Sequence, residues 1–187
     1  MQLMTNYYKS LLIFFILCPI ILVGQDFVIT GADVNGEAIN DYSGWSVSLD
    51  ADGDRMAIGA LHNDGNGNGS GHVRVYALSS GSWTQLGSDI NGEGTNDQSG
   101  SSVSMNAAGD RVAIGAAYND DNGSSSGHVR IYAYSSGSWS QLGSDIDGEA
   151  SNDQSGYSVS LNDAGDRVAI GAPYNDGASN SSGHVRI

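Results

Sequence analysis

Acidic and amide side chains recur at fixed positions in a short loop that could bind a cation. In the stretch DIDGEASND (residues 145–153), oxygen-bearing side chains stand at positions 1, 3, 5 and 9. Two further stretches, DVNGEAIND and DINGEGTND, repeat this arrangement. The candidate ligands are Asp33, Asn35, Glu37 and Asp41; Asp89, Asn91, Glu93 and Asp97; and Asp145, Asp147, Glu149 and Asp153. Because Ca²⁺ takes several oxygen ligands from alternating loop positions, the spacing predicts calcium as the cofactor.

The same loops can also be explained as solvated turns. Glycine stands at position 4, whereas the EF-hand loop has it at position 6 and ends with a bidentate Glu at position 12. Gly156 occupies position 12 here. Asp and Asn side chains cap tight turns and keep an exposed rim soluble without any metal. Both interpretations stay open from the sequence.

The loops recur because the chain is built from a 56-residue repeat. GHVR begins at residues 71, 127 and 183, and GDRMAIGA or GDRVAIGA begins at 53, 109 and 165. The repeats span 31–86, 87–142 and 143–187, and the last stops at Ile187 inside a predicted strand. We therefore expect the remaining repeats to lie in sequence beyond Ile187.

Each repeat reads as a four-stranded antiparallel meander. In the second repeat, alternating apolar residues predict strands at 101–105, 111–116, 128–134 and 138–143, and no segment has helical spacing. One meander cannot bury both faces, so the repeats must stack on one another. Four strands per repeat with both faces covered predict an all-β fold, a β-propeller of four-stranded antiparallel blades. The chain would hold about three of these blades, a partial propeller.

Particular side chains suit that stacking. Ala113 and Gly115 are small enough to let neighbouring blades approach closely, while Tyr132 and Trp139 would fill the wider gap at the rim.

The N-terminal segment and the charge narrow the setting. Residues 1–24 contain one lysine followed by an apolar run from Leu11 to Val23, which suits a signal peptide rather than a membrane span. The only cysteine, Cys18, lies inside that run, so residues 25–187 would form a secreted or cell-surface propeller without disulfides. A formal net charge of −14 disfavours nucleic acid and anionic membranes as partners.

Three stretches in fixed register carry a family resemblance. SGWSVSLDADGDRMAIGAL (43–61), SGSSVSMNAAGDRVAIGAA (99–117) and SGYSVSLNDAGDRVAIGAP (155–173) resemble the FG-GAP repeat of integrin α-subunit propellers. The resemblance implies an extracellular, non-catalytic β-propeller that works in adhesion or ligand binding.

In that family the calcium ligands lie in the hairpin between the first two strands, but here the hairpin is shorter. Its sequences are DADGD (50–54), NAAGD (106–110) and NDAGD (162–166). Two carboxylates and some carbonyls fall short of a calcium shell. We therefore expect turns whose Asx side chains bond their own backbone.

Three further sets of residues recur once per repeat. His72, His128 and His184, beside Arg74, Arg130 and Arg186, are predicted to be structural and to bond a backbone or acidic group. Arg55, Arg111 and Arg167 are expected to pair with nearby carboxylates. Asn68, Asn122 and Asn180 begin Asn-x-Ser glycosylation sequons in the loop between the second and third strands. Because this loop is long and polar, we expect it to face a ligand.

Together these observations predict an exported, non-enzymatic module for extracellular binding or adhesion, stabilised by calcium. Its partner would be an extracellular protein or a glycan. Two alternatives stay open: the propeller region of a larger secreted enzyme whose catalytic domain lies outside this sequence, and a purely structural surface repeat.

Overall fold

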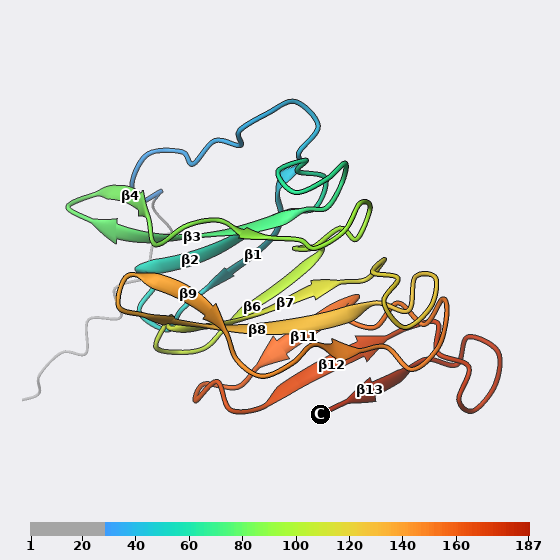
Figure 1. Cartoon of the computed structure of the whole chain (residues 1–187). Helices are drawn as coiled ribbons and strands as arrows, with labels where there is room; N and C mark the ends of the chain where they lie inside the picture. Colours follow the sequence, from blue (N-terminus) through green and yellow to red (C-terminus); the bar gives the residue numbers. More distant parts are fainter. Residues whose placement is uncertain (1–28) are drawn as a thin grey trace, which may run out of the picture.

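The computed structural model describes residues 29–187, so the predicted signal peptide lies outside the described residues. All regular elements in this range are β-strands, and they form three antiparallel sheets (Figure 1). Residues 29–187 contain no helix long and apolar enough to cross a membrane.

The first sheet comes from the first repeat. Its strands are β1 (Ser43–Leu49), β2 (Arg55–Ala60), β3 (His72–Ser79), β4 (Ser82–Gln85) and β5 (Ile90–Asn91). The order is β1-β2-β3-β4, and β5 also pairs with β3.

The second and third sheets repeat this plan. The second has β6 (Ser102–Met105), β7 (Arg111–Ala116), β8 (His128–Ser135), β9 (Ser138–Gln141) and β10 (Ile146–Asp147); the third has β11 (Ser158–Leu161), β12 (Val168–Ala172) and β13 (His184–Arg186). The four strands predicted for the second repeat are confirmed within a residue or two at their ends.

The short strands β5 and β10 were not predicted, because their residues were assigned to the acidic loops at 89–97 and 145–153, which link one blade to the next. These loops, with 33–41, are called the linking loops. The last position of the first blade is split: β4 pairs with the second half of β3, and β5 pairs with its first two residues, His72 and Val73. Each complete blade is therefore still four strand positions wide, and the linking loop is anchored to the strand that carries the histidine.

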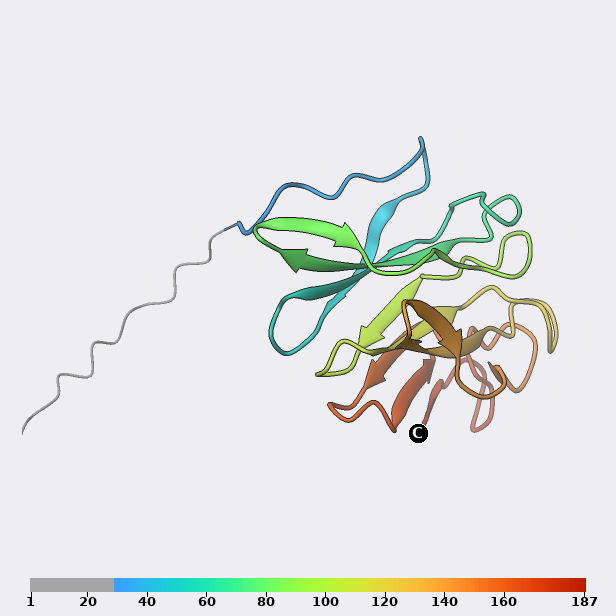
Figure 2. The ribbon, with the colours of Figure 1, turned by 60° about the vertical axis from the view of Figure 1, so that its left-hand side comes forward.

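The sheets stack face to face in chain order, as Figure 2 shows. Their first strands lie side by side, β6 next to both β1 and β11. One hydrophobic cluster joins the first two blades through Ala57, Val73, Val75 and Ile90 on one side and Val103, Met105, Val112 and Ile114 on the other. A second cluster joins the next pair through Ala113, Val129 and Ile170. Both clusters place the hydrophobic core between blades, where burying one Val or Ile side chain contributes about 1.5–3 kcal/mol. The predicted partial propeller is confirmed.

The predicted roles of the large aromatic residues and of the small residues between blades are also confirmed. Tyr132 and Trp139 pack against the first cluster, and the Trp139 indole donates a hydrogen bond to the Leu86 carbonyl of the preceding blade at 2.8 Å. Gly115 lies against the backbone of the third blade, where a Cβ would meet the Gly156 oxygen at 2.1 Å. Glycine is therefore required at this close approach.

Serines on the first strands connect successive blades. Ser102 donates to the Gly156 carbonyl at 2.7 Å, and Ser104 accepts from the Leu161 backbone N–H at 2.9 Å. Ser46 and Ser48 make the same two contacts one blade earlier. Since serine and valine alternate in these strands, one face bonds the next blade while the other supplies the core.

The expectation that the hairpin arginines pair with carboxylates is wrong. Arg111 donates to the Gly165 carbonyl of the next blade at 2.9 Å, and Arg55 donates to Gly109 at 3.0 Å. Within residues 29–187, no ion pair joins either arginine, or Arg167, to an acid. The guanidinium groups of Arg55 and Arg111 instead satisfy a backbone acceptor in the neighbouring hairpin, so these two arginines connect blades.

The hairpins themselves are the Asx turns that the sequence predicts. Asn106 Oδ1 accepts the backbone N–H groups of Asp110 and Arg111, at 3.1 and 2.9 Å. Asp50 and Asn162 do the same in the other two hairpins. The first side chain of each hairpin therefore uses its Oδ1 to accept hydrogen bonds from the backbone of its own turn.

Candidate functional site

The acidic residues of one linking loop divide between two blades. Asp89, at position 1, accepts two hydrogen bonds from Arg74 in the blade that the loop leaves. Glu93, at position 5, faces Arg130 and His128 in the blade that the loop enters. The carboxylates that gather around one histidine therefore come from two successive loops, rather than from positions 1, 3, 5 and 9 of one loop.

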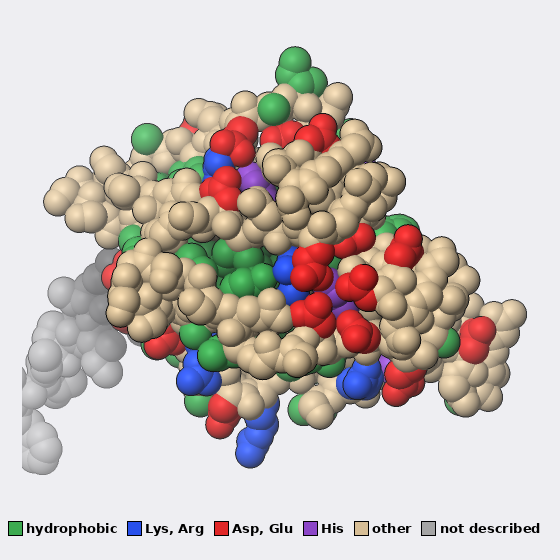
Figure 3. Space-filling view, in the orientation of Figure 1, with side chains coloured by type: hydrophobic (Ala, Val, Ile, Leu, Met, Phe, Trp, Pro, Cys, Tyr) green, Lys and Arg blue, Asp and Glu red, His purple; other side chains and the backbone are tan. Residues whose placement is uncertain are grey.

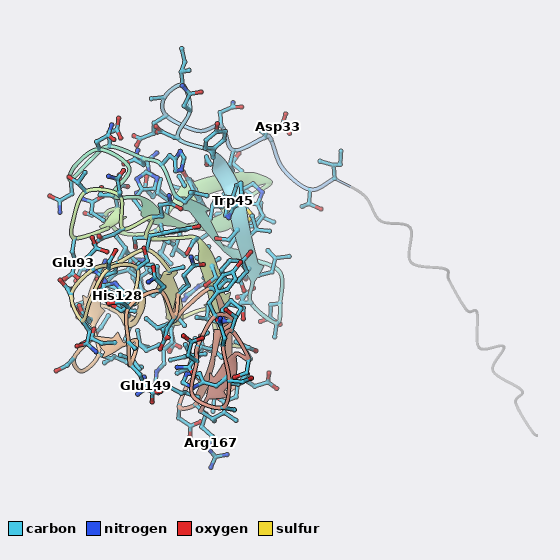
Figure 4. All side chains as sticks on the ribbon, turned by 90° about the vertical axis from the view of Figure 1, so that its right-hand side faces the viewer. Asp33, Trp45, Glu93, His128, Glu149 and Arg167 are labelled. Atoms are coloured by element: carbon cyan, nitrogen blue, oxygen red, sulfur yellow. The ribbon has the colours of Figure 1, made fainter. Side chains whose placement is uncertain are left out.

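Position 3 turns its side chain to solvent. Asn91 and Asp147 are exposed, and their backbone carbonyls accept hydrogen bonds from Arg130 and Arg186, at 2.9 and 2.7 Å. Asn35 is exposed, as is Asp33 at position 1 of the first loop. Figure 4 shows Asp33 well away from Glu93 and His128.

Position 9 is buried and fixes the loop. Asp97 Oδ2 accepts hydrogen bonds from its own loop, at the Gly94 N–H, and from the Asn119 side chain at 3.0 Å. Asp41 and Asp153 bond Asn63 and Asn175 in the same way. These buried Asp–Asn pairs join the linking loop to the loop after the second strand, so position 9 supports the architecture of both loops.

The second blade gathers the densest acidic group, which we call the His128 cluster: His128, Glu93, Asp121 and Asp145. The His128 side chain is 1% exposed, and its Nδ1 has no hydrogen-bond partner among the described residues. Carboxylate oxygens of Glu93, Asp145 and Asp121 lie 3.8, 3.9 and 4.0 Å from that nitrogen. The predicted bond from the histidine to an acidic group is therefore not made at Nδ1. Figure 3 shows acidic side chains gathered on this face around histidine and arginine.

The environment of the His128 cluster shifts its pKa values. Burial, reinforced by the nearby Arg130 charge, lowers the pKa of His128, so the imidazole is neutral at pH 7. Burial raises the pKa of Glu93, and the neighbouring carboxylates Asp145 and Asp121 raise it further. The cluster thus combines a neutral imidazole with carboxylates that repel one another.

The equivalent group in the first blade is an ion-pair network. Arg74 bonds both oxygens of Asp89, at 2.8 and 2.9 Å, and also contacts Glu37. These bonds from Arg74 lower the pKa of Asp89. Here the arginine already neutralises the acids, although His72 Nδ1 is again buried without a hydrogen bond among the described residues. In the third blade, Glu149 lies 3.6 Å from the more exposed His184.

An aromatic cavity of ≈ 410 Å³ lies where the first strands of the three blades begin. Its lining residues are Tyr42, Trp45, Leu61, His62, Gln98, Ser101, Ala117, Tyr118 and Tyr157. The Tyr42 ring lies 5.1 Å from the His62 ring and 6.4 Å from the Trp45 ring. Trp45 is 63% exposed and Tyr157 is 55% exposed. Apolar rings open to solvent beside a few polar groups are typical of a small-ligand site.

This aromatic cavity was not predicted from the sequence, although the sequence carries a signal for it. Equivalent positions of the three repeats are Trp45, Ser101 and Tyr157, which makes this one of the few positions at which all three repeats differ. Tyr42 has a positive φ of 54°, as Gln98 and Gln154 do at the equivalent positions, so this backbone conformation belongs to the turn of every repeat. Variation in an otherwise regular repeat was the available clue.

The polar loops that the sequence favoured as ligand-facing line two separate hollows. One is formed by residues that include Asp64, Asn68 and Asn96, and the other by residues that include Asn152 and Asn180. At the second sequon, the Asn122 amide donates to the Gly148 carbonyl at 2.7 Å, so this nitrogen is already bonded within the fold.

Comparison with known proteins identifies one family. The model of the FG-GAP repeat matches residues 24–76 and 91–132. No curated protein sequence matches the chain. Among solved structures, hydrazine synthase from Kuenenia stuttgartiensis is similar with a TM-score of 0.46 and 9% sequence identity, over 78% of this chain. The match covers 34% of that protein's chain, so this chain spans about a third of its length.

Proposed function

The chain belongs to the FG-GAP repeat family, and from this premise we propose that it is an exported, non-enzymatic module that binds a neutral glycan outside the cell. FG-GAP repeats are generally non-catalytic and typical of extracellular or surface proteins. The N-terminal residues 1–24, with the composition of a signal peptide, support the same location.

The observation that carries the proposal is the aromatic cavity. A sugar ring has apolar C–H faces and hydroxyl edges, so it can stack on Trp45 or Tyr118 while it bonds a polar group such as the Gln98 side chain. The net charge of −14 disfavours anionic ligands, and a neutral sugar avoids that repulsion. An extracellular protein with an exposed apolar side chain is the other partner that such a cavity could accept.

The test is a glycan array followed by titration calorimetry on the best hit. Tyr118→Ala should weaken binding at least tenfold, which is ~1.4 kcal/mol. Tyr174→Ala is the matched control, because it removes the equivalent tyrosine of the next repeat, which does not line the aromatic cavity. Equal losses from both variants would refute the cavity as the site. If the glycan array gives no hits and the chain binds only protein ligands, the ligand is a protein and not a glycan. If the chain binds neither glycans nor proteins, it is a purely structural repeat.

Calcium stabilisation is a separate proposal, supported by the acidic composition of the linking loops. Ligand binding raises stability by mass action, so calcium at millimolar concentration should raise the melting temperature. A shift below about one degree would leave the loops as solvated turns.

A further inference from the structure

His128 is a buried imidazole on a regular strand, and its Nδ1 has no hydrogen-bond partner among the described residues. It is the first residue of β8, and its backbone pairs with Ala116 on one side and Asp147 on the other. Its side chain is 1% exposed, and its Nδ1 faces three carboxylates without a hydrogen bond to any described residue. Most buried polar atoms have a partner, so an orphaned nitrogen aimed at acidic groups calls for a ligand between them.

Each of the three carboxylates is positioned by a second residue. Glu93 uses Oε1 toward Arg130 at 3.3 Å and turns Oε2 to His128. Asp145 accepts a bond from Gln141 at Oδ1 and turns Oδ2 to His128. Asp121 is oriented by the Asn119 amide at 3.2 Å. Outer residues that orient coordinating side chains in this way are a regular feature of metal sites.

The spacing fits a small tetrahedral ion. With metal–ligand distances of about 2.0–2.2 Å, two ligands of a tetrahedral zinc ion lie roughly 3.4 Å apart. The three oxygens lie 3.8–4.0 Å from Nδ1, so closure needs a shift of about half an ångström. Asp121 and Glu93 are 60% and 42% exposed, and their side chains are free to make it.

The net charge of the His128 cluster and its mixed nitrogen and oxygen ligands indicate which metal ion it would bind. The three carboxylates and Arg130 together leave two negative charges, which a divalent cation balances. Calcium and magnesium prefer shells made only of oxygen, whereas imidazole nitrogen suits zinc and its transition-metal neighbours. We propose that the second blade binds one zinc ion through His128, Glu93, Asp121 and Asp145.

The site belongs to one blade only. Asp121 is replaced by Gly65 in the first repeat and by Gly177 in the third, while the supporting asparagine is kept in all three. The turn is the same in each: the backbone N–H of Gly65, Asp121 or Gly177 donates to that asparagine at 2.9–3.0 Å. In the first blade Arg74 also occupies both oxygens of Asp89. The extra carboxylate is therefore the feature that converts an ion-pair network into a zinc site.

Asp121→Gly tests the proposal with little risk to folding, because two of the repeats already carry glycine there. The untagged, chelator-treated full chain is titrated with Zn²⁺ alone, by calorimetry and by competition with a chromophoric chelator. We expect one Zn²⁺ per chain, a raised melting temperature, and affinity at least tenfold weaker in Asp121→Gly. Asp120→Asn is the control, since it removes the adjacent charge without touching the His128 cluster, and it should change the affinity less than twofold.

Three results would overturn the proposal: no zinc bound by the wild-type chain, equal affinity in wild type and Asp121→Gly, or equal weakening by Asp120→Asn, which would mean diffuse charge attraction. Titration with Ca²⁺ separates the two metal proposals. Stabilisation by Ca²⁺ that survives Asp121→Gly would belong to the linking loops, whereas stabilisation by Zn²⁺ should be weaker in Asp121→Gly than in the wild type.

Discussion

Gly115 marks the closest contact between the second and third blades, and adding one methyl group there tests how the blades pack. In Gly115→Ala, the new Cβ would meet the backbone oxygen of Gly156 at 2.1 Å and the hydroxyl of Ser102 at 2.4 Å. Gly171 is its counterpart in the third repeat. In Gly171→Ala, the new Cβ would meet the Ser158 hydroxyl at 2.4 Å, with no backbone of another blade within reach among the described residues.

The two variants share every cost except the contact between blades. Both gain about 0.4–1 kcal/mol from lower entropy of the unfolded chain, and both must move one serine hydroxyl. Only Gly115→Ala must also separate two backbones by roughly 1 Å, because Cβ contacts below 3.0 Å do not occur. Overpacking of this kind costs ~1–3 kcal/mol, and rigid backbone on both sides puts it at the upper end. At about 2–4 °C per kcal/mol, the melting temperature should fall by roughly 6–12 °C relative to Gly171→Ala.

Urea unfolding followed by circular dichroism, with thermal scans in parallel, measures the difference. We expect a clearly lower midpoint for Gly115→Ala and an unchanged slope, since the same surface is exposed on unfolding. Free energies of unfolding that agree within about 0.5 kcal/mol would mean that Gly115 and Gly156 do not touch, and the face-to-face packing would be refuted.

Three further changes have defined outcomes. Arg111→Ala should cost ~1–2 kcal/mol of unfolding free energy, because its charged hydrogen bond to the third blade is lost, and glycan affinity should not change; a weakened ligand would contradict the purely structural role. Asn119→Ala leaves the buried Asp97 carboxylate without its amide partner, so chemical denaturation should show a loss of ~2–3 kcal/mol, against less than 0.5 kcal/mol if the pair is dispensable. Burial and Arg130 lower the pKa of His128, so the unfolded chain binds the proton more readily. Without metal, the contribution of His128 to the free energy of unfolding should be fully present above pH about 6.5 and decrease as the pH falls below that value. If His128→Asn unfolds with the same pH dependence as the wild type, His128 is not the cause of that dependence.

Most of the fold could be predicted because the same pattern of alternating apolar residues recurs in each of the three repeats. Alternation in 101–105 and 111–116 fixes which side chains share a face, and the period of 56 residues fixes that the blades are equivalent. The stacking roles of Gly115 and Trp139 followed from size alone. The family resemblance agrees with the FG-GAP match.

The site was harder to predict, because it depends on which blade each acidic residue joins. Spacing placed Asp89 and Glu93 in one candidate loop, but strand β5 pairs with β3 between them and directs the two side chains to different histidines. The error over Arg111 has a related cause: excess acid suggested a carboxylate partner, while the nearest acceptor is a carbonyl 54 residues away in sequence. Contacts across blades set both outcomes, and local sequence does not contain them.

The packing of one blade on the next is tested most directly by nuclear Overhauser spectroscopy on the isotope-labelled protein. The Gly115 Cα lies 3.2 Å from the point where a Cβ of Gly156 would stand, although the two residues are 41 positions apart in the chain. Because a Cα proton of Gly156 occupies that point, cross-peaks between the Cα protons of Gly115 and those of Gly156 are predicted. Assigned spectra in which Gly115 has cross-peaks only to its own sheet would contradict the stacked propeller.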